Sequence, residues 1–321
     1  MQIKTLQYTG DGLDSRSITG IGFQPELVII KHSAGAGGNA VFRTASMVGD
    51  LSAYVTASGG TLANAIQALE TDGFQVGTAA EVNADTVTYQ AVCIKDNATG
   101  ARLATGSYTG NGVDSRSITG VGFQPDYVWV KAAASQSAVT RSTLDSGDSS
   151  KILYPDTAAA ADQIQALETD GFQVGTNATV NTNLTTYYWW AMKYNVDSSF
   201  DSLQYTGNSV DSRTLTGLGM DMTGSNVYAI IRTNTAARAA SHRPDSLTGD
   251  ATNLWQNIAA QADYIQAFTS DGVQVGAASD VNLNTVVVDL VAWKAEAALT
   301  VPEMMAASQG GAQPAMIPVG V

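Results

Sequence analysis

One pattern of about 97–100 residues occurs three times along the chain, and this repetition constrains the fold more than any other feature. Tyr-Thr-Gly opens each copy, at Tyr8, Tyr108 and Tyr205, and an Asp-Ser-Arg triplet follows it each time. Later in each copy a second block, IQALETDGFQVG at 66–77, recurs unchanged in the next copy and as IQAFTSDGVQVG in the last. Solenoid repeats are much shorter than this, whereas domains commonly have this size. We therefore predict three tandem globular domains.

Within a copy, apolar and polar residues alternate with a period of two, which is the period of a half-buried strand. Residues 16–19 show this alternation, while 27–30 and 127–130 are continuous apolar runs typical of strands buried on both faces. The Asp-Gly pair of the second block supplies the turn of a tight hairpin, so we expect 66–69 and 74–76 to pair antiparallel. This spacing of strands and turns is typical of a β-sandwich.

The predicted fold class is all-β, with three tandem antiparallel β-sandwich modules, jelly-roll-like or related, and an extended C-terminal arm. One short helix or turn per module is expected, near 157–162, where four alanines follow one another, with a counterpart near 257–262. The predicted boundaries are 1–98 for the first sandwich repeat, 99–198 for the second, 199–297 for the diverged third and 298–321 for the arm.

The segment 298–321 differs from the rest of the chain. It contains three prolines and a pair of glycines, and it shows no hydrophobic period, so it cannot build a core alone. It is nevertheless more apolar than an ordinary solvated tail. We predict that it binds a partner surface through Met304, Met305, Met316, Ile317, Val319 and Val321.

The composition excludes several classes of function. The 321 residues carry 16 Lys and Arg against 29 Asp and Glu, and a formal charge of −13 disfavours nucleic acid and anionic membranes as partners. The sequence has no apolar run that could span a membrane, and its first residues lack the apolar block of a secretion signal. The single cysteine, Cys93, excludes internal disulfides and fits a reducing compartment.

Several polar groups resemble ligand sites, but a structural interpretation is favoured for each. We expect Asp14 and Arg16 of the first Asp-Ser-Arg triplet to form an exposed pair contributing about 0–1 kcal/mol. The loop at Gly10 lacks the repeated carboxylates that a calcium site needs. His32 and His242 are not equivalent, and neither has a nearby Cys or second His for zinc. We therefore predict no catalytic residue, no cofactor and no metal.

Two further patterns are compatible with carbohydrate chemistry. Glu70 and Asp72 resemble the acid pair of a glycoside hydrolase, but the third copy has Thr269 in place of the glutamate, which favours a hairpin. Tyr-Tyr-Trp-Trp at 187–190 could present an aromatic platform, yet the other copies do not repeat it. We interpret these aromatic residues as core packing or as contact between neighbouring modules.

Four elements of the second copy carry a family resemblance: FQPDYVWVK at 123–131, TDGFQVG at 169–175, Val-Asn at 180–181 and YWWAMK at 188–193. Together they resemble a β-rich module of tailed-bacteriophage virion structural proteins, of the head decoration (cement) or tail fibre type. The match covers most of the first two copies, is looser in the third, which lacks the Phe-Gln-Pro element, and does not include the arm. The resemblance implies a virion protein made in the host cytoplasm, and it supplies no catalytic residue.

Two virion roles follow as expectations. The first is a head decoration protein that binds the outer capsid surface, with the major capsid protein or neighbouring virion subunits as partners; self-association is also open. The alternative is a tail fibre or receptor-binding adhesin that recognises a host surface glycan. The chain has no heptads, collagen repeats or β-helix repeats of a fibre stalk, which favours decoration. Three modules can close into a ring that mimics a trimer or line up as a rod, and the sequence does not choose between them.

Overall fold

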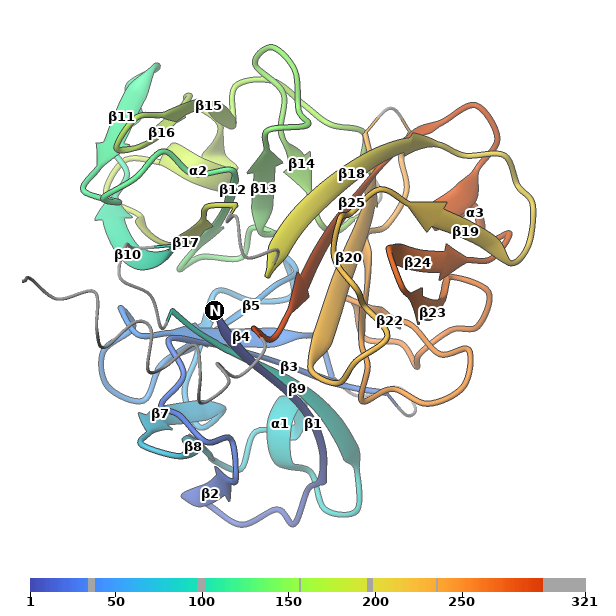
Figure 1. The fold of residues 1–321 in the computed structure, drawn as a ribbon. Coiled ribbons are helices and arrows are strands. Elements are labelled where there is room, and N and C mark those ends of the chain that lie inside the picture. Colours follow the sequence, from blue (N-terminus) through green and yellow to red (C-terminus); the bar gives the residue numbers. More distant parts are fainter. Residues whose placement is uncertain (34–37, 97–101, 156, 195–198, 235, 297–321) are drawn as a thin grey trace, which may run out of the picture.

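The regular structure of the chain is strand, apart from three one-turn helices, so the all-β prediction is confirmed for the part described. The computed structural model describes residues 1–33, 38–96, 102–155, 157–194, 199–234 and 236–296. Its strands form three sandwich-like modules, each with a larger and a smaller sheet, coloured blue, green and yellow to red in Figure 1. We call them module one, module two and module three in chain order.

The elements of the three modules correspond closely. Module one contains β1 (Gln2–Thr9), β2 (Arg16–Thr19), β3 (Leu27–His32), β4 (Val41–Thr44), β5 (Ser52–Tyr54), β6 (Thr61–Leu62), β7 (Ile66–Glu70), β8 (Gly73–Val76), α1 (Ala80–Asn83) and β9 (Thr88–Lys95). Module two contains β10 (Leu103–Thr109), β11 (Arg116–Thr119), β12 (Tyr127–Ala132), β13 (Val139–Ser142), β14 (Lys151–Ile152), β15 (Ile164–Glu168), β16 (Gly171–Val174), α2 (Ala178–Asn181) and β17 (Thr186–Met192). Module three contains β18 (Phe200–Thr206), β19 (Arg213–Thr216), β20 (Val227–Thr233), β21 (Ser241–Pro244), β22 (Asn253–Leu254), β23 (Ile265–Thr269), β24 (Gly272–Val275), α3 (Ser279–Asn282) and β25 (Val287–Lys294).

The sheets have the same topology in each module. The larger sheet of module one has the order β1-β9-β3-β4-β5-β6, and its smaller sheet has the order β2-β8-β7. The other modules repeat this with five strands in the larger sheet and three in the smaller. The predicted hairpin is confirmed, since β7 pairs antiparallel with β8, and a bulge lies between Ile66 and Ala68. The last strand of each module is central, between the first and third strands.

The alanine-rich segment near 157–162 is not a helix, and neither is its counterpart near 257–262. Both contain bends and an isolated bridge, so the helix alternative is wrong. Ala160 forms an isolated antiparallel bridge, and the N–H of Ala159 donates to the carbonyl of Asn234 in module three at 3.1 Å. This pairing between modules overrides the helix preference of alanine, which amounts to less than about 1 kcal/mol per residue. The three observed helices, α1, α2 and α3, lie instead just before the last strand of each module.

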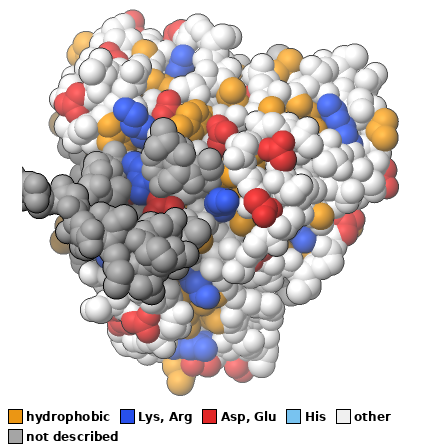
Figure 2. Space-filling view, in the orientation of Figure 1, with side chains coloured by type: hydrophobic (Ala, Val, Ile, Leu, Met, Phe, Trp, Pro, Cys, Tyr) orange, Lys and Arg blue, Asp and Glu red, His pale blue; other side chains and the backbone are white. Residues whose placement is uncertain are grey.

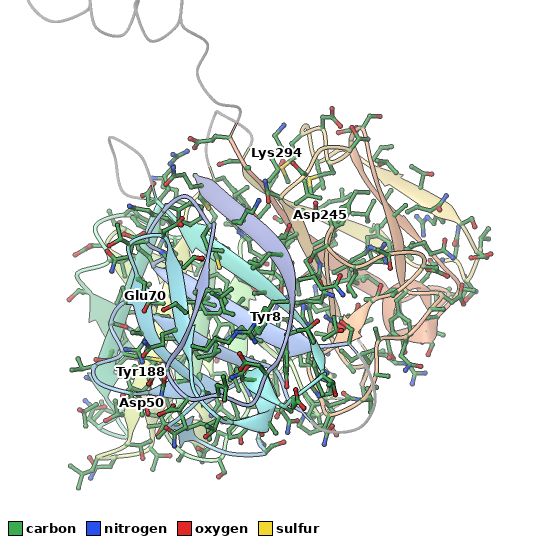
Figure 3. All side chains as sticks on the ribbon, turned by 90° about the horizontal axis from the view of Figure 1, so that it is seen from below. Tyr8, Asp50, Glu70, Tyr188, Asp245 and Lys294 are labelled. Atoms are coloured by element: carbon green, nitrogen blue, oxygen red, sulfur yellow. The ribbon has the colours of Figure 1, made fainter. Side chains whose placement is uncertain are left out.

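Each larger sheet has one hydrophobic core on either face, which explains the continuous apolar runs of the sequence. In β3, Val28 and Ile30 point into the core of module one, together with Tyr8, whose ring stacks on Tyr89. Figure 3 labels Tyr8 among the strands of this module. Leu27 and Ile29 point the opposite way, into a fourth core that modules two and three also build. A strand with cores on both faces needs apolar residues at every position rather than at alternate ones.

The fourth core, which we call the shared core, joins the three modules around one axis. It contains buried residues of every module, with Phe42 from module one, Trp129 and Trp190 from module two, and Trp255 and Trp293 from module three. Figure 1 shows the modules arranged as a closed ring around the centre, where β1 begins. The chain therefore adopts the ring and not the rod.

Candidate functional site

The repeated Thr-Asp-Gly turn is held by its own aspartate. The carboxylate of Asp72 accepts hydrogen bonds from the N–H groups of Gly22, at 2.6 Å, and Gly20, at 3.0 Å. These bonds stabilise the charged carboxylate and lower its pKa. Glu70 accepts a bond from the hydroxyl of Ser17 at 3.0 Å. Asp170 and Asp271 repeat the aspartate bonds in their modules. Both acids of this block therefore brace the hairpin.

Arg16 does not pair with Asp14, and this expectation is corrected. The Nε atom of Arg16 lies 3.3 Å from Oδ2 of Asp11, while Asp14 accepts a hydrogen bond from the side chain of Gln67 at 2.9 Å. Ser15, between them, has a φ of 58°, and this left-handed turn prevents its two neighbours from sharing a face.

The arginine of the triplet has the same structural role in every module. Its guanidinium donates to the carbonyl of the Tyr-Thr-Gly threonine at 2.6–2.7 Å and lies over the tyrosine ring at 5.3–5.7 Å. The residues concerned are Arg16, Arg116 and Arg213, with Thr9, Thr109 and Thr206 and with Tyr8, Tyr108 and Tyr205. The repeated triplet thus ties the end of the first strand to the start of the second.

A second repeated arginine is buried inside each module. Arg43 donates to the carbonyls of Gly49, at 2.7 Å, and Ile66, at 3.2 Å, and burial lowers its pKa. Arg141 and Arg243 make the corresponding bonds. These side chains satisfy loop carbonyls that the sandwich takes away from water. The hairpin aspartates and both sets of repeated arginines are therefore used within the fold.

Both histidines are buried side chains, and they belong to different modules. The ring of His32 is 2% exposed and meets that of Tyr89 edge-on, with 6.0 Å between centroids. His242 is 2% exposed, stacks on Trp255 with 3.9 Å between ring centroids, and shares a hydrogen bond of 3.2 Å with the hydroxyl of Tyr228. Burial lowers its pKa well below the usual value, so it is neutral at pH 7. Among the described residues, no three His, Cys, Asp or Glu side chains lie close enough together to hold a metal ion.

The aromatic run at 187–190 is packed inside the protein. Tyr187, Trp189 and Trp190 are at most 5% exposed. Trp189 and Tyr187 belong to the core of module two, while Trp190 points the other way into the shared core. Core packing and contact between modules, the interpretation favoured from the sequence, is confirmed. These three rings are not available as a platform for a sugar.

Backbone hydrogen bonds connect the modules in a cyclic order. The N–H of Ala138 in module two donates to Val55 of module one at 2.8 Å, and the N–H of Ala240 in module three donates to Leu153 of module two at 3.3 Å. The N–H of Ala40 in module one donates to Trp255 of module three at 3.0 Å and completes the cycle. The three donors occupy equivalent positions, as do the three acceptors. Each interface is therefore heterologous, since it joins two different surfaces of the module, and the ring closes after three modules.

Each of the three interfaces also contains one buried lysine. The ammonium of Lys31 donates to the carbonyl of Ile258, at 3.0 Å, and that of Lys131 to the carbonyl of Gly59, at 3.2 Å, in both cases across the interface. Between modules two and three, Lys151 reaches the carbonyl of Ala236 at 3.2 Å. The lysines are at most 1% exposed and donate to further carbonyls of their own module. At each interface one buried lysine thus ties two backbones together.

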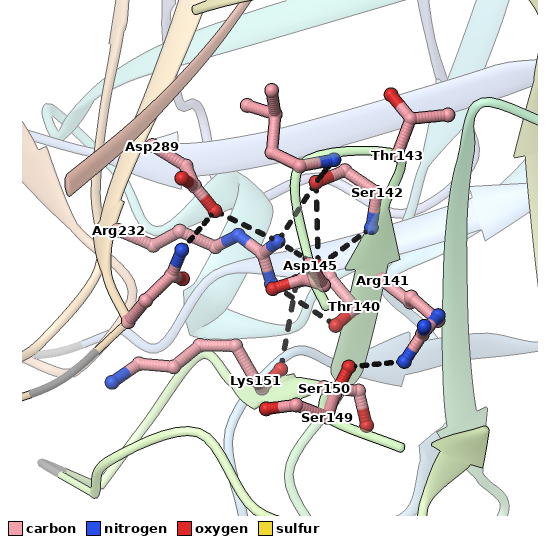
Figure 4. A network of polar contacts seen from close by, with 12 residues as sticks. Thr140, Arg141, Ser142, Thr143, Asp145, Ser149, Ser150, Lys151, Arg232 and Asp289 are labelled. Atoms are coloured by element: carbon pink, nitrogen blue, oxygen red, sulfur yellow. Dashed lines mark hydrogen bonds and ion pairs between the residues drawn. The ribbon is translucent and has the colours of Figure 1, made fainter. Parts of the chain in front are cut away.

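Lys151 comes from a different position because Arg232 occupies the one equivalent to Lys31 and Lys131. Figure 4 shows the Arg232 side chain reaching from β20 toward β13 of module two. It forms an ion pair with Asp145 across the interface, and its Nη2 lies 3.2 Å from Oδ2 of Asp289 in its own module. Burial alone would lower the pKa of Arg232, but the two carboxylates raise it above its usual value.

The buried lysines make the stability of the ring depend on pH. Burial lowers the pKa of Lys131 to about 7 and that of Lys31 to about 8, whereas an unfolded lysine titrates near 10.4. Between these values the unfolded chain binds more protons than the folded chain, so the free energy of unfolding rises with pH. We expect a rise of about 1–2 kcal/mol from pH 7 to 8.5 in urea titrations. Lys131→Met should remove most of this slope, and a fall in stability over the range would contradict the assignment.

The range ends near pH 8.5 because Cys93 acts in the opposite direction. Burial raises the pKa of its thiol in the folded protein, so ionisation of the unfolded thiol favours unfolding once the pH exceeds about 8.5.

The predicted partner-binding side chains of the arm, Met304, Met305, Met316, Ile317, Val319 and Val321, lie outside the described residues. Sequence reasoning missed the buried cations of the interfaces. A signal for them exists, because Lys31, Lys131 and Arg232 each end an apolar run, VIIK, VWVK or AIIR, at the same position of the three copies. In the described parts of the chain, no helix is long and apolar enough to cross a membrane.

A family model described as a domain of unknown function, DUF7483, matches residues 2–107 and 102–199. Because the two matches cover more than half of the chain, the chain belongs to this family. Each match has the length of one module, which supports the tandem repeat. No curated protein and no solved structure matches the chain.

Proposed function

We propose that this member of the DUF7483 family is a bacteriophage virion structural protein, namely a head decoration protein that binds the outer capsid surface. The observation that supports this role is the closed ring of three similar modules within one polypeptide. Such a ring presents each loop of the module three times around one axis. It therefore matches a position on a shell where three copies of a capsid protein meet.

The ring gives one chain three contacts with the shell. Three weak contacts made by one rigid body act together, because the second and third form at a high effective concentration once the first has formed. The same three sites exist only where capsid subunits are assembled, so binding favours the assembled shell over free subunits. By mass action the decoration protein then stabilises that shell.

A passive role also agrees with the use of the repeated polar residues. The aspartates of the hairpins and the two sets of arginines are engaged in holding strands and loops together. The alternative, an adhesin that recognises a host glycan, receives no support from the aromatic run, because three of its four side chains are buried. The predicted capsid-binding arm at 298–321 remains part of the proposal.

Sedimentation with intact particles tests this function. We expect the purified chain to sediment with particles that lack it, to ignore unassembled capsid subunits, and to appear at threefold or quasi-threefold positions in images of the particle. A chain shortened to end at Ala298 should fold normally and bind particles less tightly. Binding to host cells or their surface polysaccharide, without binding to heads, would establish the adhesin instead.

A further inference from the structure

In the described part of the protein, most of the large hydrophobic side chains that are exposed lie on the same two neighbouring loops of each module. Five large hydrophobic side chains are exposed among the described residues: Leu13, Val48, Val113, Leu184 and Val210. Leu13, Val113 and Val210 occupy the same position in the three modules, on the loop between the first and second strands, and are 65%, 58% and 56% exposed. Single exposed aliphatic residues are ordinary, but their recurrence at one position of a repeat is not explained by packing.

The backbone at each of these positions is fixed on both sides. The N–H of Leu13 donates to the side chain of Asp11 at 2.9 Å, and its carbonyl accepts from the buried amide of Asn83 at 2.8 Å. Val113 and Val210 are held in the same way, at 3.0 and 2.8 Å, by the asparagines of their modules. The aliphatic side chain is thus presented to solvent on a rigid loop, so ordering it on binding costs little entropy.

Leu184 extends the same surface in module two. It lies on the loop after α2, is 82% exposed, and its N–H donates to the carbonyl of Gly110 at 2.9 Å on the adjacent loop. Thr86 and Thr285 make the same bond in the other modules, at 3.0 Å. Leu184 has a φ of 62°, a conformation that a leucine adopts at a cost. Four of the five exposed aliphatic side chains therefore belong to these paired loops.

The three loops that carry Leu13, Val113 and Val210, which we call the loop tips, lie on the outside of the ring. Each loop tip also has an acidic residue at one repeated position. Figure 1 shows the connections from β1 to β2, from β10 to β11 and from β18 to β19 at the periphery of the three modules. Asp14, Asp114 and Asp211 follow the aliphatic residue directly and are exposed. On the face shown in Figure 2, hydrophobic side chains form small separate groups rather than one broad patch.

We propose that these three loop tips are the surface through which the ring contacts the shell. Each tip inserts its aliphatic side chain into an apolar recess of one of three symmetry-related copies of the capsid protein. Lysine or arginine at the rim of the recess faces the aspartate beside it. Because the tips are at separate corners of the ring, the three recesses belong to three copies of one partner. The inference rests on the proposed function and names the surface that performs it.

Substitutions to serine at the three tips test the proposal. Leu13→Ser, Val113→Ser and Val210→Ser should each weaken binding to particles about 5- to 10-fold, and the triple variant should weaken it more than about 100-fold. Val48→Ser is the matched control, because Val48 is 86% exposed and lies outside these loops; its binding should equal that of the wild type. Thermal unfolding of all variants should be unchanged, since the altered side chains are solvated.

Three results would overturn the inference in different ways. If the wild-type chain binds particles and the triple variant binds them equally well, the tips are not the contact surface and the proposed function stands. If the wild-type chain does not bind particles, the proposed function fails together with the inference. Self-association of the wild-type chain that the triple variant abolishes would identify a second copy as the occupant, and it would also overturn the assignment to the shell.

Discussion

Asp145→Ala is expected to lower the free energy of unfolding by about 3–5 kcal/mol, which would be among the largest effects of a polar substitution in this chain. The Asp145 side chain is 1% exposed, pairs with Arg232 across the interface of modules two and three, and accepts the N–H of Ser142 at 2.7 Å. Its removal leaves a buried guanidinium with the single carboxylate of Asp289. Urea titration followed by tryptophan fluorescence measures the loss.

Asp148→Ala is the matched control, because Asp148 belongs to the same loop but is exposed and caps a turn through the N–H of Asp162 at 3.1 Å. We expect it to cost about 1 kcal/mol. A cost for Asp145→Ala no larger than this would contradict the buried ion pair.

A triple variant separates charge from packing at this interface. Asp145→Met, Arg232→Met and Asp289→Gln replace all three charges at once, with Met47 and Gln90 as the natural models at two equivalent positions. Replacing a whole buried charge network by side chains of similar volume is often neutral, whereas removing one partner is costly. The triple variant should therefore recover most of the stability that Asp145→Ala loses. If the triple variant is as unstable as Asp145→Ala, the loss of stability comes from altered packing and not from the unpaired charge.

The fold of one module is largely predictable from the sequence, because its signals are local. The Asp-Gly turn forms the hairpin of β7 and β8, and the apolar run of β3 is a strand buried on both faces. The helix alternative for the alanine-rich segment near 157–162 is wrong because the backbone of this segment pairs with module three, a contact that no local preference encodes.

The arrangement of the modules could not be predicted from the sequence pattern, because it too depends on contacts between modules. A continuous apolar run such as 27–30 indicates two buried faces, yet it does not say whether a helix, a sheet or another module covers the second face. The choice of ring over rod depends on complementarity between surfaces far apart in the chain, such as Trp129 against Trp255. The buried cations Lys31 and Lys131 are interpretable only once the opposing carbonyls are known.

Trp190→Ala and Trp189→Ala form the second pair of large expected effects, and they distinguish the shared core from the core of one module. The two residues are neighbours on β17, point to opposite faces, and are 1% and 5% exposed. Trp190 stacks on Trp129 with 5.2 Å between ring centroids and lies 6.4 Å from Trp293 of module three. Trp189 contacts Phe172 of its own module at 5.8 Å. Each substitution should cost about 3–5 kcal/mol in urea titrations.

The two variants should differ in whether the modules stay together after the connections between them are cut. With protease sites placed in 97–101 and 195–198, the wild-type chain can be cut between its modules and the fragments purified through a tag on one of them. We expect the fragments of the wild type and of Trp189→Ala to remain together, because their shared core is intact. Those of Trp190→Ala should separate, because its cavity lies where modules two and three meet. Equal behaviour of the two variants would mean that the peptide connections, rather than the shared core, keep the three modules in a ring.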